Sequence, residues 1–218
     1  MTRKLFILFA LLMIPAPKMF AQDKGQPAAP VMGSAYGQRL QIPGIKNAGR
    51  LNGVLYRGAQ PHEEALAQLK ALGITTIVDL REEDPARREN EKKEAESLGM
   101  QFVSIPVGGW SAPTNEQVAQ FLSLFRDKPN EKVFVHCHLG EDRTGVFVAT
   151  YRMAIEKWRS EQALKEMDFF GFNRRWHPAM SAFVRDFPAR LTTAPALAAF
   201  KDPKAPGATK TSTELKPN

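Results

Sequence analysis

The 218-residue sequence predicts an α/β fold with a central, mostly parallel sheet flanked by helices and a helical C-terminal part. Three observations support this fold class. Strand-like and helix-like segments alternate along residues 54–136. Three further helix-like segments then follow without a strand between them. The composition, with 43% hydrophobic and 24% charged residues, is globular, and the length suits one domain of roughly 150 residues with tails.

Four segments have the composition of strands. Residues 74–80, Ile-Thr-Thr-Ile-Val-Asp-Leu, are β-branched and apolar, as expected for a strand that is buried on both faces. Residues 132–136 are similar and lead directly into the single cysteine of the sequence. The other two predicted strands cover residues 54–57 and 101–106.

Six helices are predicted from the spacing of apolar residues and from boundary signals. A proline in the first turn and a glycine just beyond the end delimit a helix over residues 61–72. Thr114 and Gln117 have the spacing of a capping box, so a helix is expected to begin there and to run to about residue 127. The remaining predicted helices cover residues 85–98, 145–158, 160–170 and 177–187.

The N-terminus has the pattern of a secretory signal peptide, predicted over residues 1–21. Arg3 and Lys4 precede ten apolar residues, and Pro15 follows them. Ten residues cover only about half of a bilayer core, which disfavours the alternative of a retained anchor. The protein is therefore expected to be exported, to the periplasm or the medium, with membrane contact only through an uncleaved signal segment.

The rest of the chain divides into a folded part and two tails. Residues 22–40 and 191–218 are predicted to be flexible, because they are rich in small, polar and basic residues without periodic apolar positions. Residues 41–190 are predicted to form the single folded domain. No oligomeric state is predicted from the sequence.

Charge and cysteine content exclude several classes of protein. The formal net charge is +7, but residues 41–200 carry 21 basic and 20 acidic residues, so the excess belongs to the ends. A nucleic-acid surface needs basic residues clustered on one face, and no nucleic-acid partner is expected. The single cysteine, Cys137, excludes an intramolecular disulfide and zinc sites built on several cysteines.

The most informative segment is residues 135–145, Val-His-Cys-His-Leu-Gly-Glu-Asp-Arg-Thr-Gly. It places Cys137 at the end of a predicted strand, with Arg143 just before a predicted helix. A loop of this kind directs backbone N–H groups into one concavity, where the helix dipole adds partial positive charge. A phosphoryl group fits such a cradle, and the same field favours the thiolate form of Cys137 at its floor. Gly140 allows the backbone to approach the ligand closely.

This segment resembles the Cys-x5-Arg-Thr signature of the protein tyrosine and dual-specificity phosphatase superfamily. Residues 55–61, Leu-Tyr-Arg-Gly-Ala-Gln-Pro, residues 69–81, which end in Val-Asp-Leu-Arg, and the later Ala163-x2-Glu166 also resemble the compact atypical dual-specificity phosphatases of plants, fungi and bacteria. The resemblance covers about residues 50–190. It implies a protein tyrosine phosphatase-like fold, with residues 41–190 as the catalytic domain, and hydrolysis of phosphate monoesters through a cysteinyl-phosphate intermediate.

The resemblance also implies a role for each residue of the loop. Cys137 is expected to be the nucleophile, Thr144 to donate a hydrogen bond to its sulfur, and His136 to orient the loop. No metal or other cofactor is expected, because the arginine and the backbone amides stabilise the charge on the phosphoryl oxygens. The residues expected to bind the substrate phosphate are His138, Leu139, Gly140, Glu141, Asp142 and Arg143.

The proton donor to the leaving group is left open. Relatives usually supply an aspartate from the loop after the strand over residues 101–106, and this loop contains none. Asp142, directly before the arginine, is the first alternative, Glu116 is the second, and an acidic leaving group needs no donor. Asp84 is interpreted as part of an exposed helix start. Asp79 is interpreted as a brace of the sheet end.

The resemblance leaves the substrate open between a phosphorylated protein and a small phosphomonoester. A protein tyrosine or dual-specificity phosphatase is the first interpretation, and an inositol phosphate phosphatase of the phytase type is the alternative. Glu141 inside the signature favours a substrate with one phosphate, because an acid repels further phosphates. A phosphate-binding module without turnover, and a redox protein that uses Cys137, are the competing classes. Trp110 is expected to be either a lid residue or a core anchor.

Overall fold

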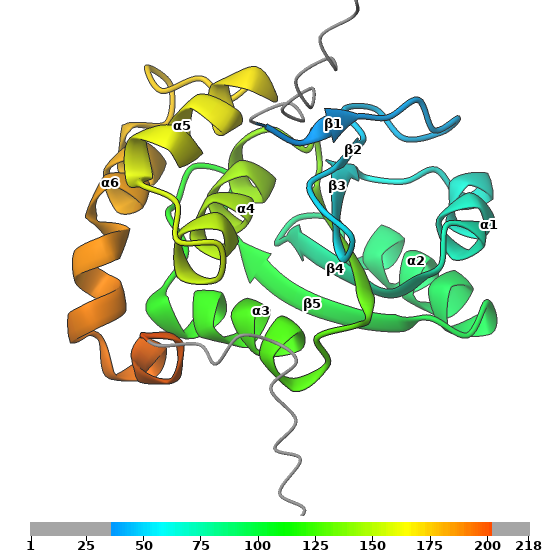
Figure 1. The fold of residues 1–218 in the computed structure, drawn as a ribbon. Coiled ribbons are helices and arrows are strands. Elements are labelled where there is room, and N and C mark those ends of the chain that lie inside the picture. Colours follow the sequence, from blue (N-terminus) through cyan, green and yellow to red (C-terminus); the bar gives the residue numbers. More distant parts are fainter. Residues whose placement is uncertain (1–35, 202–218) are drawn as a thin grey trace, which may run out of the picture. The chain divides into compact units, whose positions relative to one another are not determined.

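The computed structural model describes residues 36–201 (Figure 1). The predicted signal peptide and most of both predicted tails lie outside this range. Within the described residues, one sheet has the strand order β1-β2-β3-β6-β4-β5. Its strands are β1 (Gln38–Arg39), β2 (Gly49–Arg50), β3 (Leu55–Ala59), β4 (Ile74–Arg81), β5 (Gln101–Val107) and β6 (Lys132–Cys137).

The four longer strands run parallel and confirm the predicted α/β class. Strand β6 lies between β3 and β4, and β4 also pairs with β5. Strands β1 and β2 pair antiparallel at one edge. They were not predicted, because two residues are too few to show an alternating pattern. The central position of β6 brings the carboxyl ends of three neighbouring strands to the loop that follows Cys137.

Helices cover both faces of this sheet (Figure 1). Buried side chains of α1 (Glu63–Ala71) and α2 (Pro85–Ser97) pack on one face, against Ile74, Ile77 and Phe134. The other face carries the larger core, which includes Val78, Val133 and Val135. Its helices are α3 (Asn115–Asp127), α4 (Asp142–Ala154), α5 (Ser160–Phe169), α6 (Pro178–Thr193) and the short 3-10 helix η1 (Pro195–Phe200).

Most helix boundaries agree with those predicted from the sequence. At the start of α3, Thr114 and Gln117 form the predicted capping box. Helix α4 differs, because it begins at Asp142 rather than at residue 145 and ends at Ala154 rather than at residue 158. An acidic residue is favoured in a first helical turn, where it faces the positive end of the dipole. Arg143 therefore lies in the first turn of α4, at a fixed position relative to the loop.

The predicted domain limits at residues 41 and 190 are too narrow. At the N-terminal side, β1 joins the sheet and the backbone N–H of Gly37 donates to Glu166 Oε1 at 2.8 Å. At the C-terminal side, α6 continues beyond Phe187, where the prediction ended it, through Pro188 to Thr193, and η1 follows. Leu197 and Phe200 are buried in the core. Residues 191–200 were predicted to be flexible, but their apolar side chains make them part of the domain.

Each helix within residues 36–201 is too short or too polar to span a lipid bilayer.

Candidate active site

The loop between β6 and α4 carries the candidate site. Cys137 is the last residue of β6 and has a free thiol, and its side chain is buried, with 3% exposure. In the sheet register Cys137 lies opposite Ala59 of β3, and His136 lies opposite Asp79 of β4. Ligands of parallel sheets bind at the carboxyl ends of the strands, and Cys137 occupies such an end beside a helix N-terminus.

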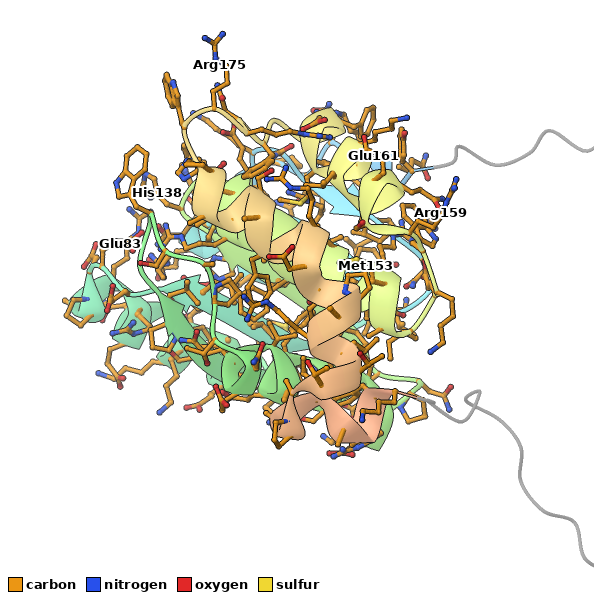
Figure 2. All side chains as sticks on the ribbon, turned by 90° about the vertical axis from the view of Figure 1, so that its left-hand side faces the viewer. Glu83, His138, Met153, Arg159, Glu161 and Arg175 are labelled. Carbon is orange, nitrogen blue, oxygen red and sulfur yellow. The ribbon has the colours of Figure 1, made fainter. Side chains whose placement is uncertain are left out.

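Cys137 and Arg143 line the same cavity, of about 460 Å³. Four more residues predicted to bind phosphate line it, namely His138, Leu139, Glu141 and Asp142. Figure 2 shows His138 and Glu83, another lining residue, on the same side of the molecule. The remaining lining residues come from the β5–α3 loop and the α5–α6 connection, and they are Gly109, Trp110, Gly171, Asn173, Trp176 and His177.

The backbone of the loop is arranged to receive an anion. The N–H groups of His138, Leu139, Gly140 and Glu141 have no hydrogen-bond acceptor among residues 36–201. Gly140 has a φ of 72°, and a Cβ there would lie 2.4 Å from the backbone of Gly58. Only glycine allows this close approach to β3. Unpaired N–H groups in a loop that precedes a helix form an anion-binding concavity.

Arg143 is held in place by Glu83, which follows β4. Nη1 and Nη2 of Arg143 donate to the two carboxylate oxygens of Glu83 at 2.7 and 2.8 Å, and Nη1 also donates to the Val107 carbonyl at 3.1 Å. The arginine hydrogen bonds lower the pKa of Glu83 to about 2. Burial opposes the charge of Arg143, but Glu83 and the charge of Cys137 outweigh burial and raise the pKa of the guanidinium. The Nε–H and the second proton of Nη2 remain for a ligand.

Asp142 lies at the rim of the cavity beside His177. Asp142 Oδ2 and His177 Nε2 are 3.3 Å apart, and the Trp110 ring stacks on His177 with centroids 4.7 Å apart. Burial raises the pKa of the Asp142 carboxyl, although His177, a backbone hydrogen bond from Asn173 and Arg143 act in the opposite direction. Trp110 itself is 71% exposed, so of the two predicted roles the core anchor is wrong.

His136 belongs to a buried ionic cluster behind the loop. Its Nε2 lies 2.7 Å from Glu91 Oε1, and its Nδ1 lies 3.4 Å from the Cys137 carbonyl oxygen. Burial favours the neutral ring, but the charges of Glu91 and Asp79 outweigh burial and raise the pKa of His136. Asp79, Glu91 and His136 have ligand atoms within 4.8 Å of one another. Arg81 donates to both carboxylates, so a guanidinium already supplies the positive charge there.

The remaining candidate residues lie outside the cavity that holds Cys137. Thr144 is fully buried, but its hydroxyl has no hydrogen-bond partner among the described residues, so the expected bond to the Cys137 sulfur is not formed. Glu116 is exposed in the first turn of α3 and does not line the cavity. Asp84 caps α2 by accepting the N–H of Arg87 at 3.1 Å. Asp79 accepts both the N–H and the guanidinium of Arg81, as a brace does.

The chain is similar to several known phosphatases. Residues 45–186, more than half of the chain, match the family described as DSP-PTPase phosphatase fused to NAD+ kinase. The dual specificity protein phosphatase TpbA of Pseudomonas aeruginosa is 29% identical over 126 residues. That match covers 58% of this chain and 55% of TpbA, so the chain spans about half the length of this relative.

Two further similarities concern a fungal relative and a solved structure. The putative tyrosine-protein phosphatase OCA1 of Mycosarcoma maydis is 26% identical over 66% of this chain and 92% of its own length. The crystal structure of P. aeruginosa TpbA superposes with a TM-score of 0.61 and 26% identity, over 78% of this chain and 99% of that one. The family match over residues 45–186, together with the cysteine and arginine in one cradle, shows that this chain belongs to the DSP-PTPase phosphatase family described as fused to NAD+ kinase.

Proposed function

We propose that this protein hydrolyses phosphate monoesters through a cysteinyl-phosphate intermediate. The proposal rests on one cavity that both Cys137 and Arg143 line, next to loop amides that have no acceptor among residues 36–201. An anion-binding cradle with a cysteine at its floor suits in-line phosphoryl transfer, because the amides and the guanidinium stabilise the equatorial oxygens. Similarity to a dual specificity phosphatase supports the same activity.

The proposed reaction has two steps. In the first, the Cys137 thiolate forms a bond to phosphorus, the bond from phosphorus to the leaving oxygen breaks, and Asp142 gives that oxygen a proton. In the second, a water oxygen attacks phosphorus, the sulfur–phosphorus bond breaks, and Asp142 takes a proton from the water. Cys137 returns as thiolate, and inorganic phosphate leaves. Two easier steps thus replace one difficult step.

Asp142 is the proposed acid because it lines the cavity whereas Glu116 does not. A general acid must be protonated, so activity falls as the pH rises through its pKa. The raised pKa of Asp142 moves this fall to higher pH than for an ordinary aspartate. For a phenyl phosphate substrate we expect Asp142→Asn to lower kcat by about 10²-fold and to remove the alkaline fall. Glu116→Gln is the matched control, and a profile that changes only in this control contradicts the assignment.

Phosphotyrosine in proteins is the proposed substrate. Trp110 and Trp176 are both exposed and both line the cavity that holds Cys137. Aromatic side chains at the rim suit an aryl phosphate, because they offer flat apolar surface to its ring. The dual specificity of the relative TpbA supports a protein substrate.

Turnover of an aryl phosphate, measured with and without vanadate, tests whether the protein hydrolyses phosphate monoesters at all. Phosphate binding without turnover, or reaction of the cysteine with peroxide alone, would overturn the proposed hydrolysis.

An inositol phosphate is the alternative substrate, and one observation favours it. A second cavity, of about 480 Å³, shares His138 and Glu141 with the first and carries Lys46 and Arg87 in its lining. Neither Lys46 nor Arg87 has an acidic partner among residues 36–201. Unpaired cations beside the cradle suit a ligand with several phosphates. Glu141 opposes such a ligand, because its carboxylate faces the same space.

The two substrates are distinguished by reversing these charges. We expect the parent to have a higher kcat/KM for a phosphotyrosine peptide than for inositol hexakisphosphate. The double variant Lys46→Glu, Arg87→Glu should lower the ratio of inositol phosphate to peptide activity by about tenfold, because two attractions to phosphate become repulsions. Lys93→Glu, on the exposed side of α2 near its own partner Glu89, is a control for charge alone. A parent that prefers the inositol phosphate would replace the phosphotyrosine proposal.

A further inference from the structure

Arg57 is an unusual buried arginine beneath the proposed active-site loop. It lies in β3, and its side chain is fully buried, with 0% exposure. No carboxylate of the described residues lies within ion-pair distance of its guanidinium, and its Nε and Nη1 atoms have no hydrogen-bond partner there. Its contacts are the ring of Phe170, 4.2 Å from the guanidinium carbon, and the carbonyl of Gly140, to which Nη2 donates.

Burying a cation without an ion pair destabilises the folded protein, because the charge loses its hydration. We therefore expect Arg57 to have a role that offsets this loss of stability. The charges of Glu166, Cys137 and Glu141 act to raise the pKa of Arg57, while that of Arg39 lowers it further. Burial outweighs them and lowers the pKa to about 10. Arg152, by contrast, is a buried arginine that is paired with both Glu166 and Glu156.

The hydrogen bond to Gly140 constrains the direction of the peptide group. Asn47 Nδ2 donates to the same carbonyl at 3.1 Å, so two side chains hold it. Nearby, the N–H of Gln60 donates to the His138 carbonyl at 3.2 Å. Both carbonyls are therefore directed to the β3 side of the loop. In a planar trans peptide the C=O and the N–H of the next residue point in opposite directions.

The opposite direction is that of the cavity that holds Cys137. No residue of β3 lines this cavity, whereas Ala59 and Gln60 line the cavity on the other side of the loop. The N–H of Glu141, which shares a peptide group with the Gly140 carbonyl, is thus turned away from β3, to the side of the loop on which the cavity that holds Cys137 lies. The N–H of Leu139 is turned in the same way by the bond from Gln60. Both are among the amides without an acceptor.

We propose that Arg57 is a positioning residue of the active-site loop: by holding the Gly140 carbonyl on the β3 side, it keeps the Glu141 amide directed at the phosphoryl group and adds positive charge beneath the cradle. The inference rests on the proposed function and extends it to a residue that does not touch the substrate. Preorganised donors matter because they need no reorientation when charge develops in the transition state. Without Arg57, the Gly140 carbonyl keeps only the hydrogen bond from Asn47, so the peptide after Gly140 can turn more readily and direct its carbonyl at the phosphate.

The test compares Arg57→Met with Arg152→Met in the full-length protein. Both variants remove a buried guanidinium, but only Arg57 contacts the loop. For Arg57→Met we expect kcat/KM for p-nitrophenyl phosphate to fall by about 10²-fold, the loss typical of one oxyanion-hole donor, and the vanadate inhibition constant to rise by more than about tenfold. Arg57→Lys, which retains charge and a donor, should recover part of both values. Arg152→Met should change both by less than about threefold at temperatures well below its Tm.

Asn47→Gly is a second variant in case Arg57→Met does not fold. Asn47 has a φ of 51°, which glycine adopts without strain, and the variant removes the other donor to Gly140. It should weaken vanadate inhibition as well. A folded Arg57→Met that keeps kcat/KM and vanadate inhibition within about threefold of the parent would overturn the inference, as would an unaltered Asn47→Gly where Arg57→Met does not fold. A parent without turnover refutes the proposed function instead, and vanadate binding by calorimetry then tests Arg57 independently.

Discussion

Cys137→Ser is expected to abolish hydrolysis while leaving the cradle able to bind an oxyanion. Serine keeps the shape of the side chain, but its hydroxyl does not ionise at neutral pH and its oxygen is a poor leaving group from phosphorus. We expect kcat to fall by about 10⁴-fold or more, as when other enzymes lose their covalent nucleophile. Tungstate, measured by calorimetry, should bind no more weakly than to the parent, because its partners are the loop amides and Arg143.

Tungstate binding distinguishes loss of the nucleophile from loss of the fold. A variant that has lost its fold would lose hydrolysis and tungstate binding together, and its circular dichroism would change. Turnover retained in Cys137→Ser would contradict the nucleophile assignment. Loss of tungstate binding from a folded Cys137→Ser would show that the amides do not form the anion site.

Arg143→Lys is expected to have the second-largest effect. Arg143 bridges Glu83 and the cavity, and it does so with a planar fork whose two ends bind both carboxylate oxygens. A lysine is a single point charge, so it cannot keep both contacts to Glu83 and still present two donors to phosphate. We expect kcat to fall by about 10²- to 10³-fold, with p-nitrophenyl phosphate as substrate.

Glu83→Gln tests the same geometry from the other partner. An amide has one acceptor oxygen, so glutamine holds only one of the two Arg143 nitrogens, and we expect kcat/KM to fall by about tenfold. Arg152→Lys is a control, because Arg152 is buried and paired with Glu166 away from the cavity. A normal rate in Arg143→Lys would show that the arginine serves the fold alone.

The loop and its neighbouring elements were predictable because their signal is local. Residues 135–145 are contiguous, and the strand before them and the helix after them have clear patterns. The partner of Arg143 was not predicted. Glu83 is 60 positions away, and the contact depends on β4 lying beside β6 in the sheet. The available signal was that acidic residues lie just beyond the end of a buried parallel strand, since the carboxyl ends of such strands meet at one edge of the sheet.

Other parts of the site depend on tertiary structure in the same way. His177 reaches Asp142 through the α5–α6 connection, and Arg57 reaches Gly140 from β3. In the sequence, Arg57 was recognised only as part of residues 55–61, which resemble the family. Nothing in the sequence showed that its side chain is buried without an ion pair. Helix α6 continues through Pro188 because packing outweighs the loss of one backbone hydrogen bond, which local propensity does not reveal.

The proposed mechanism requires Cys137 to carry the phosphoryl group during turnover, and trapping the phosphorylated enzyme shows whether it does. Asp142→Asn is mixed with p-nitrophenyl phosphate, whose leaving group needs no proton, and is quenched in acid within milliseconds. The second step is slow in this variant, because the water lacks its base. We expect the peptide containing Cys137 to gain the mass of one HPO₃ group and to lose it on longer incubation. An unmodified Cys137 during release of p-nitrophenol, or phosphate on another residue, would contradict it.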